Sequence, residues 1–233
     1  ALLRGVSYET SSATQLVQLM ADLKSPANNT NTVALQRVPK IAVYSPDGAQ
    51  PWDDAVTMVL EYADIPFTTI YDTEILDGSL GDYQWLHLHH EDFTGQYGKF
   101  YAAFGSYPWY KEQVRSLEAS AAALGFNKVS ELKLAVANTI KNFVIGGGFL
   151  FTMCSGTDSF DIALAAHETD ICESIFDHDP ADRNCQEKLD YTKTFAFENF
   201  ELVRDPMQYE YSDIDGTSLH KRNENTDKFT LFE

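Results

Sequence analysis

Cys154 occupies a position at which α/β enzymes can carry a nucleophile. It follows FLFTM, a largely apolar run from 149 to 153 that is typical of a parallel strand covered on both faces. The pattern predicts that an amphipathic helix begins at once, capped by Ser155, Thr157 or Asp158. A thiol at such a turn faces the crevice at the carboxyl ends of the strands and the positive end of the helix dipole, and both favour a reactive thiolate. The alternative is a buried structural cysteine.

A run of histidines and acids ends another predicted strand, QWLHLH. Side chains alternate along a strand, so His87 and His89 share one face. The loop beyond holds His90, Glu91 and Asp92. Sequential parallel strands are often neighbours, and we therefore expect this loop beside the cysteine. His90 or His89 would then be the base of the thiol. Glu91 or Asp92 would orient that base.

The same residues allow other interpretations. A metal-dependent hydrolase could be built on His87, His89 and Asp92, but no HExxH or comparable ligand spacing is present. The alternative without a functional site is that the histidine side chains pack in the core and the acidic side chains are exposed to solvent. The main interpretation needs no metal and no cofactor. It places a substrate against the following residues: Asp47, His89, Asp92, Ser155 and Gly156.

The order of elements predicts an α/β fold, a flavodoxin-like three-layer sandwich with a mainly parallel sheet. Strands are expected at 40–45, 67–71, 84–89 and 149–153. Helices are expected from 52 to 63, 109 to 124, 132 to 144 and 159 to 167. Near the C-terminus, alternating and aromatic-rich patterns at 194–203 and 208–211 predict a β-rich excursion of antiparallel strands.

The chain is expected to consist of an N-terminal arm, 1–39, and one α/β domain, 40–233. The arm contains a predicted helix from 13 to 23. The last residues, 227–233, alternate between apolar and polar types as in the middle of a strand. We therefore expect the domain to be truncated at its C-terminus.

The amino-acid composition limits the classes of partner that the chain is expected to bind. The 35 acidic residues against 17 basic ones give a net charge of −18, which disfavours nucleic acid and anionic membranes. No apolar run is long enough to span a membrane. With nucleic acid and membranes both disfavoured, a small molecule is the expected partner. Cys172 and Cys185 could form one disulfide and leave Cys154 free. With a formal glycosylation triplet at 28–30 and no initial methionine, the chain leans towards a periplasmic or secreted protein with its leader removed.

The chain resembles the class I glutamine amidotransferase-like superfamily, which also contains the DJ-1/PfpI-type cysteine hydrolases and chaperones and the ThuA-like proteins. GGGFLFTMCSG is similar to that superfamily's glycine-rich approach to a nucleophile elbow. Four stretches resemble a bacterial group labelled asparagine synthetase B-like: KIAVYSPDG, PWDDAV, WLHLHHEDFTGQYGKF and MCSGTDSFDIALAA. The resemblance covers most of 40–203.

The resemblance implies an amidohydrolase in which Cys154 attacks a small carboxamide, with the Ser155 amide at the oxyanion and His90 and Glu91 completing the site. It implies as an alternative a ThuA-like protein that binds a sugar or an amino acid without nucleophilic catalysis. The sequence departs from the GxCxG elbow, because Thr152 stands at the first glycine. The superfamily's late HxE-type motif is also absent after Val203, so a missing C-terminal part would supply it or the site is built differently.

Overall fold

A computed structural model describes residues 10–25, 27–28, 38–46 and 54–214. The chain divides into two compact units, 1–38 and 39–233. In the first unit, helix α1 (Ala13–Lys24) begins after Ser12, whose hydroxyl accepts a hydrogen bond from the Gln15 amide in a capping box. Asp47 and the predicted strand at 227–233 lie outside the described residues, as does part of the triplet at 28–30.

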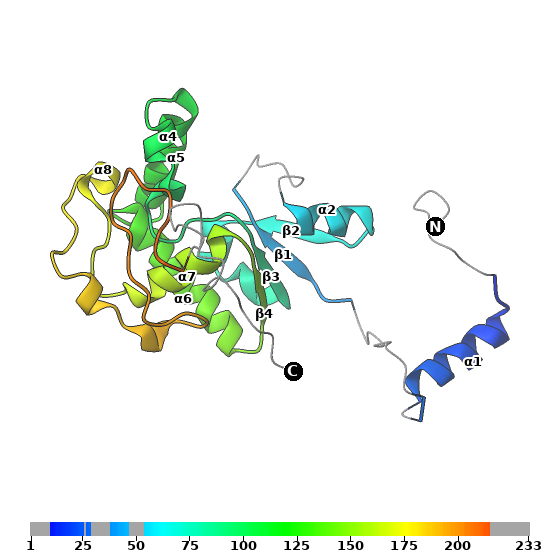
Figure 1. Ribbon diagram of the computed structural model, residues 1–233. Coiled ribbons are helices and arrows are strands. Elements are labelled where there is room, and N and C mark those ends of the chain that lie inside the picture. Colours follow the sequence, from blue (N-terminus) through cyan, green and yellow to red (C-terminus); the bar gives the residue numbers. More distant parts are fainter. Residues whose placement is uncertain (1–9, 26, 29–37, 47–53, 215–233) are drawn as a thin grey trace, which may run out of the picture. The chain divides into compact units, whose positions relative to one another are not determined.

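The second unit is built on one parallel sheet with the strand order β2-β1-β3-β4. Its strands are β1 (Ile41–Tyr44), β2 (Phe67–Ile70), β3 (Trp85–Leu88) and β4 (Phe149–Thr152). In this register His87 lies between Val43 of β1 and Phe151 of β4. Since all four strands run the same way, their carboxyl ends meet at one edge of the sheet (Figure 1). The predicted flavodoxin-like arrangement is confirmed.

Helices cover both faces of the sheet, which makes the three layers. On one face, Leu60 of α2 (Ala55–Tyr62) packs against Ile41 and Val43. The other face carries the larger core, with α6 (Val129–Ile145) and α7 (Ser155–Ala165) packed on it (Figure 1). The remaining helical segments are shorter or peripheral: α3 (Asp72–Leu76), η3 (Ser79–Asp82), η4 (Tyr97–Lys99), α4 (Tyr101–Phe104), α5 (Pro108–Ala123), α8 (Ser174–Asp177), η5 (Gln186–Lys188) and η6 (Tyr191–Lys193).

Helix α7 begins directly after Cys154, as predicted, but its N-cap residue is Cys154 itself and makes no side-chain cap. It also differs from the amphipathic helix expected at 159–167, because nine of its 11 residues are buried. One side faces the sheet core, and Ile162 and Ala165 on the other side pack into a second cluster formed by the segment that follows. That second cluster includes Ile171, Leu189, Phe200 and Tyr211. The helix is covered on both sides because the chain from 166 to 214 returns over it.

The prediction of antiparallel strands at 194–203 and 208–211 is wrong. One isolated antiparallel bridge joins Leu202 and Ser212, and no strand is assigned between 166 and 214. The reason lies in the hydrogen bonds of the backbone. The Asp161 carboxylate accepts from the amides of 195, 196 and 197, at 2.9, 2.7 and 2.9 Å. The Leu202 amide donates to the Gln186 side chain at 2.7 Å. Side chains take the amides that a strand ladder would use.

All three cysteines are free thiols, so the alternative of a bridge between Cys172 and Cys185 is not realised. The Cys185 side chain is buried in the second cluster, and the Cys172 thiol donates to the Thr94 carbonyl at 3.1 Å. Within the described residues, no helix has both the length and the apolar character needed to cross a membrane.

Candidate functional site

Cys154 joins β4 to α7 in an unusual backbone conformation. Its φ is +51° and its ψ is −141°, whereas residues other than glycine rarely adopt a positive φ because the Cβ atom meets the backbone. The side chain is exposed at the carboxyl edge of the sheet, immediately before the first turn of an 11-residue helix. A sharp, strained turn from strand to helix is the geometry that presents a nucleophile at the top of an α/β sheet.

The loop after β3 lies against this turn, as the sequence predicted. The Gly156 amide donates to the His89 carbonyl at 2.9 Å, and the Ser155 hydroxyl donates to the His90 carbonyl at 2.8 Å. One turn later, the Ser159 hydroxyl donates to the Glu91 carbonyl at 2.9 Å. A Cβ atom at position 156 would lie 2.6 Å from the His89 carbonyl oxygen, so only glycine fits there. The loop and the start of α7 therefore form one joined unit.

The end of β3 and the loop after it place side chains on opposite sides of the sheet. On the α2 side, the buried His87 ring has Nε2 2.5 Å from Oδ2 of Asp54 and Nδ1 3.1 Å from the Phe151 carbonyl oxygen. Asp54 also caps α2, because its Oδ1 accepts from the Val56 amide at 2.7 Å. His89, on the same strand face, has Nδ1 3.9 Å from Oδ1 of Asp54.

On the other side of the sheet, Glu91 belongs to a buried polar network and is not placed as the orienting group for a histidine. The Tyr71 hydroxyl donates to its carboxyl group. The Lys133 ammonium donates to the hydroxyls of Tyr44 and Tyr71, at 2.8 and 3.0 Å, and to both oxygens of Asp72, at 3.0 Å. Tyr44 donates to Asp72 as well. The four acceptors occupy all three protons of the ammonium group. The Lys133 charge is therefore directed at Asp72 within the protein.

Burial sets the protonation of Glu91. The carboxyl group is enclosed, although the residue as a whole is partly exposed. Desolvation raises its pKa from 4.5 to about 7, and the nearby charges of Asp72 and Asp92 act in the same direction, against the Lys133 ammonium. Glu91 therefore changes charge near neutral pH. A carboxyl group of this kind can donate or accept a proton from a bound molecule.

A cavity of about 250 Å³ opens beside Glu91, at the carboxyl ends of β1, β2 and β3. Its lining includes Tyr71, His90, Asp92 and Lys133, and α5 contributes Gln113 and two serines. Asp92 itself is fixed by its surroundings, because it accepts from the Thr94 amide and hydroxyl and from the Gly98 amide, at 2.7, 2.6 and 3.0 Å. The cavity has the size and polarity for a small polar molecule.

Two residues at this edge, Asp54 and Lys133, are absent from the site that the sequence predicted. Asp54 caps α2, and its contact with His87, which is 33 positions away in the chain, follows only from the fold. Lys133 sits inside the apolar pattern of α6, and a lysine on a buried helix face was the available signal. Asp47 lies outside the described residues.

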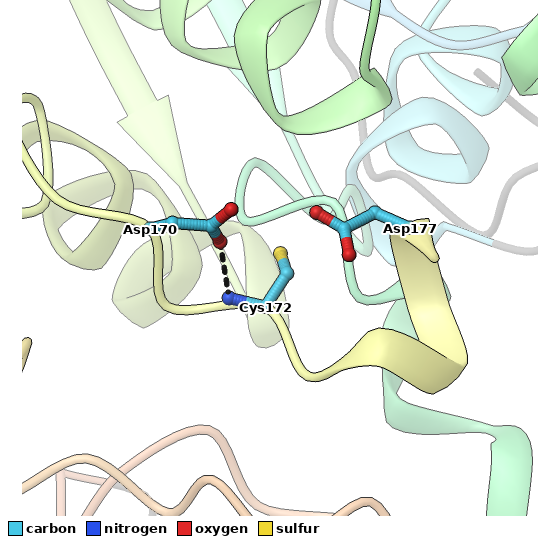
Figure 2. Close-up of side chains that lie close together, drawn as sticks. All are labelled: Asp170, Cys172 and Asp177. Carbon is cyan, nitrogen blue, oxygen red and sulfur yellow. Dashed lines mark hydrogen bonds between the residues drawn. The ribbon is translucent and has the colours of Figure 1, made fainter. Parts of the chain in front are cut away.

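A separate cluster lies beside the Thr94 carbonyl of the β3 loop. Asp170, Cys172 and Asp177 are the one group in the described part of the chain whose ligand atoms are close enough for a metal (Figure 2). The Lys128 ammonium already lies 2.6 Å from Asp170 and 2.9 Å from Asp177. Burial raises the pKa of the Cys172 thiol, and the two aspartates add to this effect. The lysine supplies the positive charge and the thiol stays protonated, so the cluster is best explained as a structural ion pair.

Comparison with known proteins adds no further assignment. No family model matches the chain, and neither the curated proteins nor the solved structures contain a match.

Proposed function

We propose that the chain is a cysteine-dependent amidohydrolase of the glutamine amidotransferase-like type, acting on a small carboxamide. The observation that carries the proposal is the backbone of Cys154, which holds an exposed thiol in a strained turn between β4 and α7. Strain of this kind persists only where the surrounding structure enforces it, and it gathers at active sites. Here the hydrogen bonds from Gly156 and Ser155 to the β3 loop hold the strained turn in place.

The chemistry would follow from this placement. The Cys154 thiolate attacks the carboxamide carbon, and the new C–S bond places a negative charge on the carbonyl oxygen. The Ser155 amide, first in α7, is expected to contribute to the stabilisation of that charge. A base from the β3 loop takes the thiol proton and returns it to the leaving nitrogen, which departs as ammonia. Water then cleaves the thioester, releasing a carboxylic acid and the free thiol.

The cavity beside Glu91 is the proposed substrate site. His90 lines it, and the His90 carbonyl is bound to the residue after Cys154, so the cavity opens next to the thiol-bearing turn. Its volume of about 250 Å³ suits a molecule the size of an amino acid or a monosaccharide.

Covalent trapping tests the proposal. The protein is incubated with a diazoketone analogue of glutamine, and peptide mass analysis reads out modification at Cys154, Cys172 and Cys185 separately. We expect stoichiometric addition at Cys154 alone, lost in Cys154→Ser. A parallel iodoacetamide titration should show labelling of Cys154 that continues well below pH 8, where an ordinary thiol of pKa about 8.5 is mostly protonated. Slow labelling with ordinary pH dependence would overturn the proposal.

One observation favours a second candidate, a small-ligand binding protein of the ThuA-like kind. Among the described residues, those lining the cavity include His90, Glu91 and Asp92 but not Cys154. A ligand could therefore bind without meeting the thiol. A panel of sugars and amino acids, screened by thermal shift on wild type and Cys154→Ser, tests this candidate. Equal stabilisation of both proteins, with no product formed by the wild type, would favour binding over catalysis.

A further inference from the structure

We propose that Asp54 is a positioning residue that orients His89 as the base for Cys154. The inference rests on the proposed function. It assigns the base to the first histidine after β3 and its orienting carboxylate to the N-cap of α2.

Asp54 is built into the structure as a shared acceptor. The carboxylate is nine-tenths buried, with 10% of the side chain exposed, and one of its oxygens is 2.5 Å from His87. The other oxygen accepts from the Val56 amide at 2.7 Å and lies 3.9 Å from Nδ1 of His89. Asp54 is therefore held by two partners while it faces a third.

The His89 ring has one buried nitrogen, Nδ1, without a hydrogen-bond partner among the described residues. The charged and titratable groups around the ring are Asp54 of the α2 cap, His87 of the same strand and His90 of the loop. Burial lowers the pKa of His89, and His90 and His87 lower it further, against the opposing effect of Asp54. A neutral ring with Nδ1–H towards Asp54 has the lone pair on Nε2, as a base requires.

The other acids near the loop are already engaged. Glu91 is bonded to Tyr71 on the far side of the sheet, and Asp92 accepts from Thr94 and Gly98. The His89 carbonyl, by contrast, accepts from the Gly156 amide, two residues after the cysteine. The backbone of His89 is thereby fixed against the turn that carries the thiol. Within the part of the chain that the structure describes, Asp54 is the carboxylate that faces the His89 ring, with Oδ1 3.9 Å from Nδ1.

The proton transfer would then run from Cys154 Sγ to His89 Nε2. It leaves a thiolate and an imidazolium, and the imidazolium gains a charged partner in Asp54. In alkylation by iodoacetamide, the thiolate forms a C–S bond, iodide leaves, and the proton ends on His89 or in the buffer. Loss of the Asp54 charge weakens the imidazolium–thiolate pair, and less thiolate is present at low pH.

The test compares alkylation rates of Cys154 from pH 5 to 9 in four proteins: wild type, Asp54→Asn, His89→Asn and the double variant. Asparagine is as good an N-cap as aspartate, so Asp54→Asn keeps α2 and removes the charge. We expect each single variant to lower the rate at pH 6 by about tenfold, the effect of about one pKa unit on a thiolate fraction. The double variant should be no slower than His89→Asn.

Asp190→Asn is the matched control. Asp190 caps η6 through the Thr192 amide, and its own amide donates to the Ala165 carbonyl, at the end of α7 away from Cys154. The Asp190→Asn variant loses the same charge as Asp54→Asn, and we expect its Cys154 to be alkylated at the wild-type rate.

Three outcomes would overturn the inference. If Cys154 reacts rapidly in wild type and equally rapidly in Asp54→Asn, Asp54 has no positioning role. If Asp54→Asn slows the reaction further in the His89→Asn background, it acts by another route. If Cys154 of the wild type reacts slowly with ordinary pH dependence, the proposed function fails with it. The first two outcomes leave the proposed function standing.

Discussion

At Cys154 the backbone and the side chain make opposite demands, since the conformation favours glycine and the proposed chemistry needs a thiol. A strained residue of this kind costs on the order of 1–3 kcal/mol. We therefore predict that Cys154→Gly is about 1 kcal/mol more stable to denaturant than Cys154→Ala, which keeps the Cβ atom and the strain. Equal stability of the two variants would show that the turn is relaxed. Neither variant should add the glutamine analogue.

Glu91 makes a second prediction at this scale. Its pKa in the folded protein, about 7, lies above its ordinary value of 4.5, so the folded state holds the proton more tightly. This contribution to stability is complete below about pH 4.5 and is lost as the pH rises through 7. Glu91→Gln cannot titrate. We expect the unfolding free energy of wild type relative to Glu91→Gln to fall on the order of 2 kcal/mol between pH 5 and pH 8. A constant difference would contradict the burial of this carboxyl group.

At the scale of elements, the contact between α7 and the β3 loop decides the outcome at Gly156. Alanine normally stabilises a helix relative to glycine, by up to about 1 kcal/mol. Here its Cβ atom would lie 2.6 Å from the His89 carbonyl oxygen, so we expect a loss of about 1–3 kcal/mol instead. Gly81→Ala is the matched control, because nothing lies within 4 Å of a Cβ atom there. Chemical denaturation of both variants measures the difference, and a gain in Gly156→Ala would refute the close approach.

Asp161 makes a prediction for the chain that covers α7. It is buried and accepts from three consecutive amides at 195–197. Removing the carboxylate in Asp161→Ala leaves these amides without their acceptor, at an expected cost on the order of 3 kcal/mol. Asp161→Asn keeps one acceptor oxygen and should lose less. Hydrogen exchange of 195–197 should rise in both variants, and unchanged protection would show that the contact is not needed.

The elements that the sequence predicted are those whose patterns are local. Strands such as Ile41–Tyr44 and helices such as Val129–Ile145 follow from apolar runs and periodicity, and the edge holding Cys154 follows from their order. The stretch 194–211 failed because Asp161, more than 30 positions earlier, takes its amides. The contact of Asp54 with His87 and the place of Glu91 are likewise set by tertiary structure. No spacing in the chain encodes them.

At the scale of the whole molecule, charge is the dominant property. A net charge of −18 on 233 residues means that the folded protein repels itself. Salt screens such repulsion over about 10 Å at 0.1 M. We therefore expect Tm to rise when NaCl is increased from about 10 to 200 mM, at constant pH. A fall in Tm would mean that local ion pairs, such as those of Lys128, outweigh the repulsion.

The burial of α7 on both sides also determines how fast its amide hydrogens exchange with solvent. Its amide hydrogens are covered by the sheet on one side and by the returning chain on the other, so no small local opening exposes them. They should be among the last in the protein to exchange with deuterium, at the rate of global unfolding. The thiol at the start of that helix nevertheless meets solvent directly. The proposed nucleophile, freely accessible to solvent, would thus be carried by the slowest-opening part of the domain.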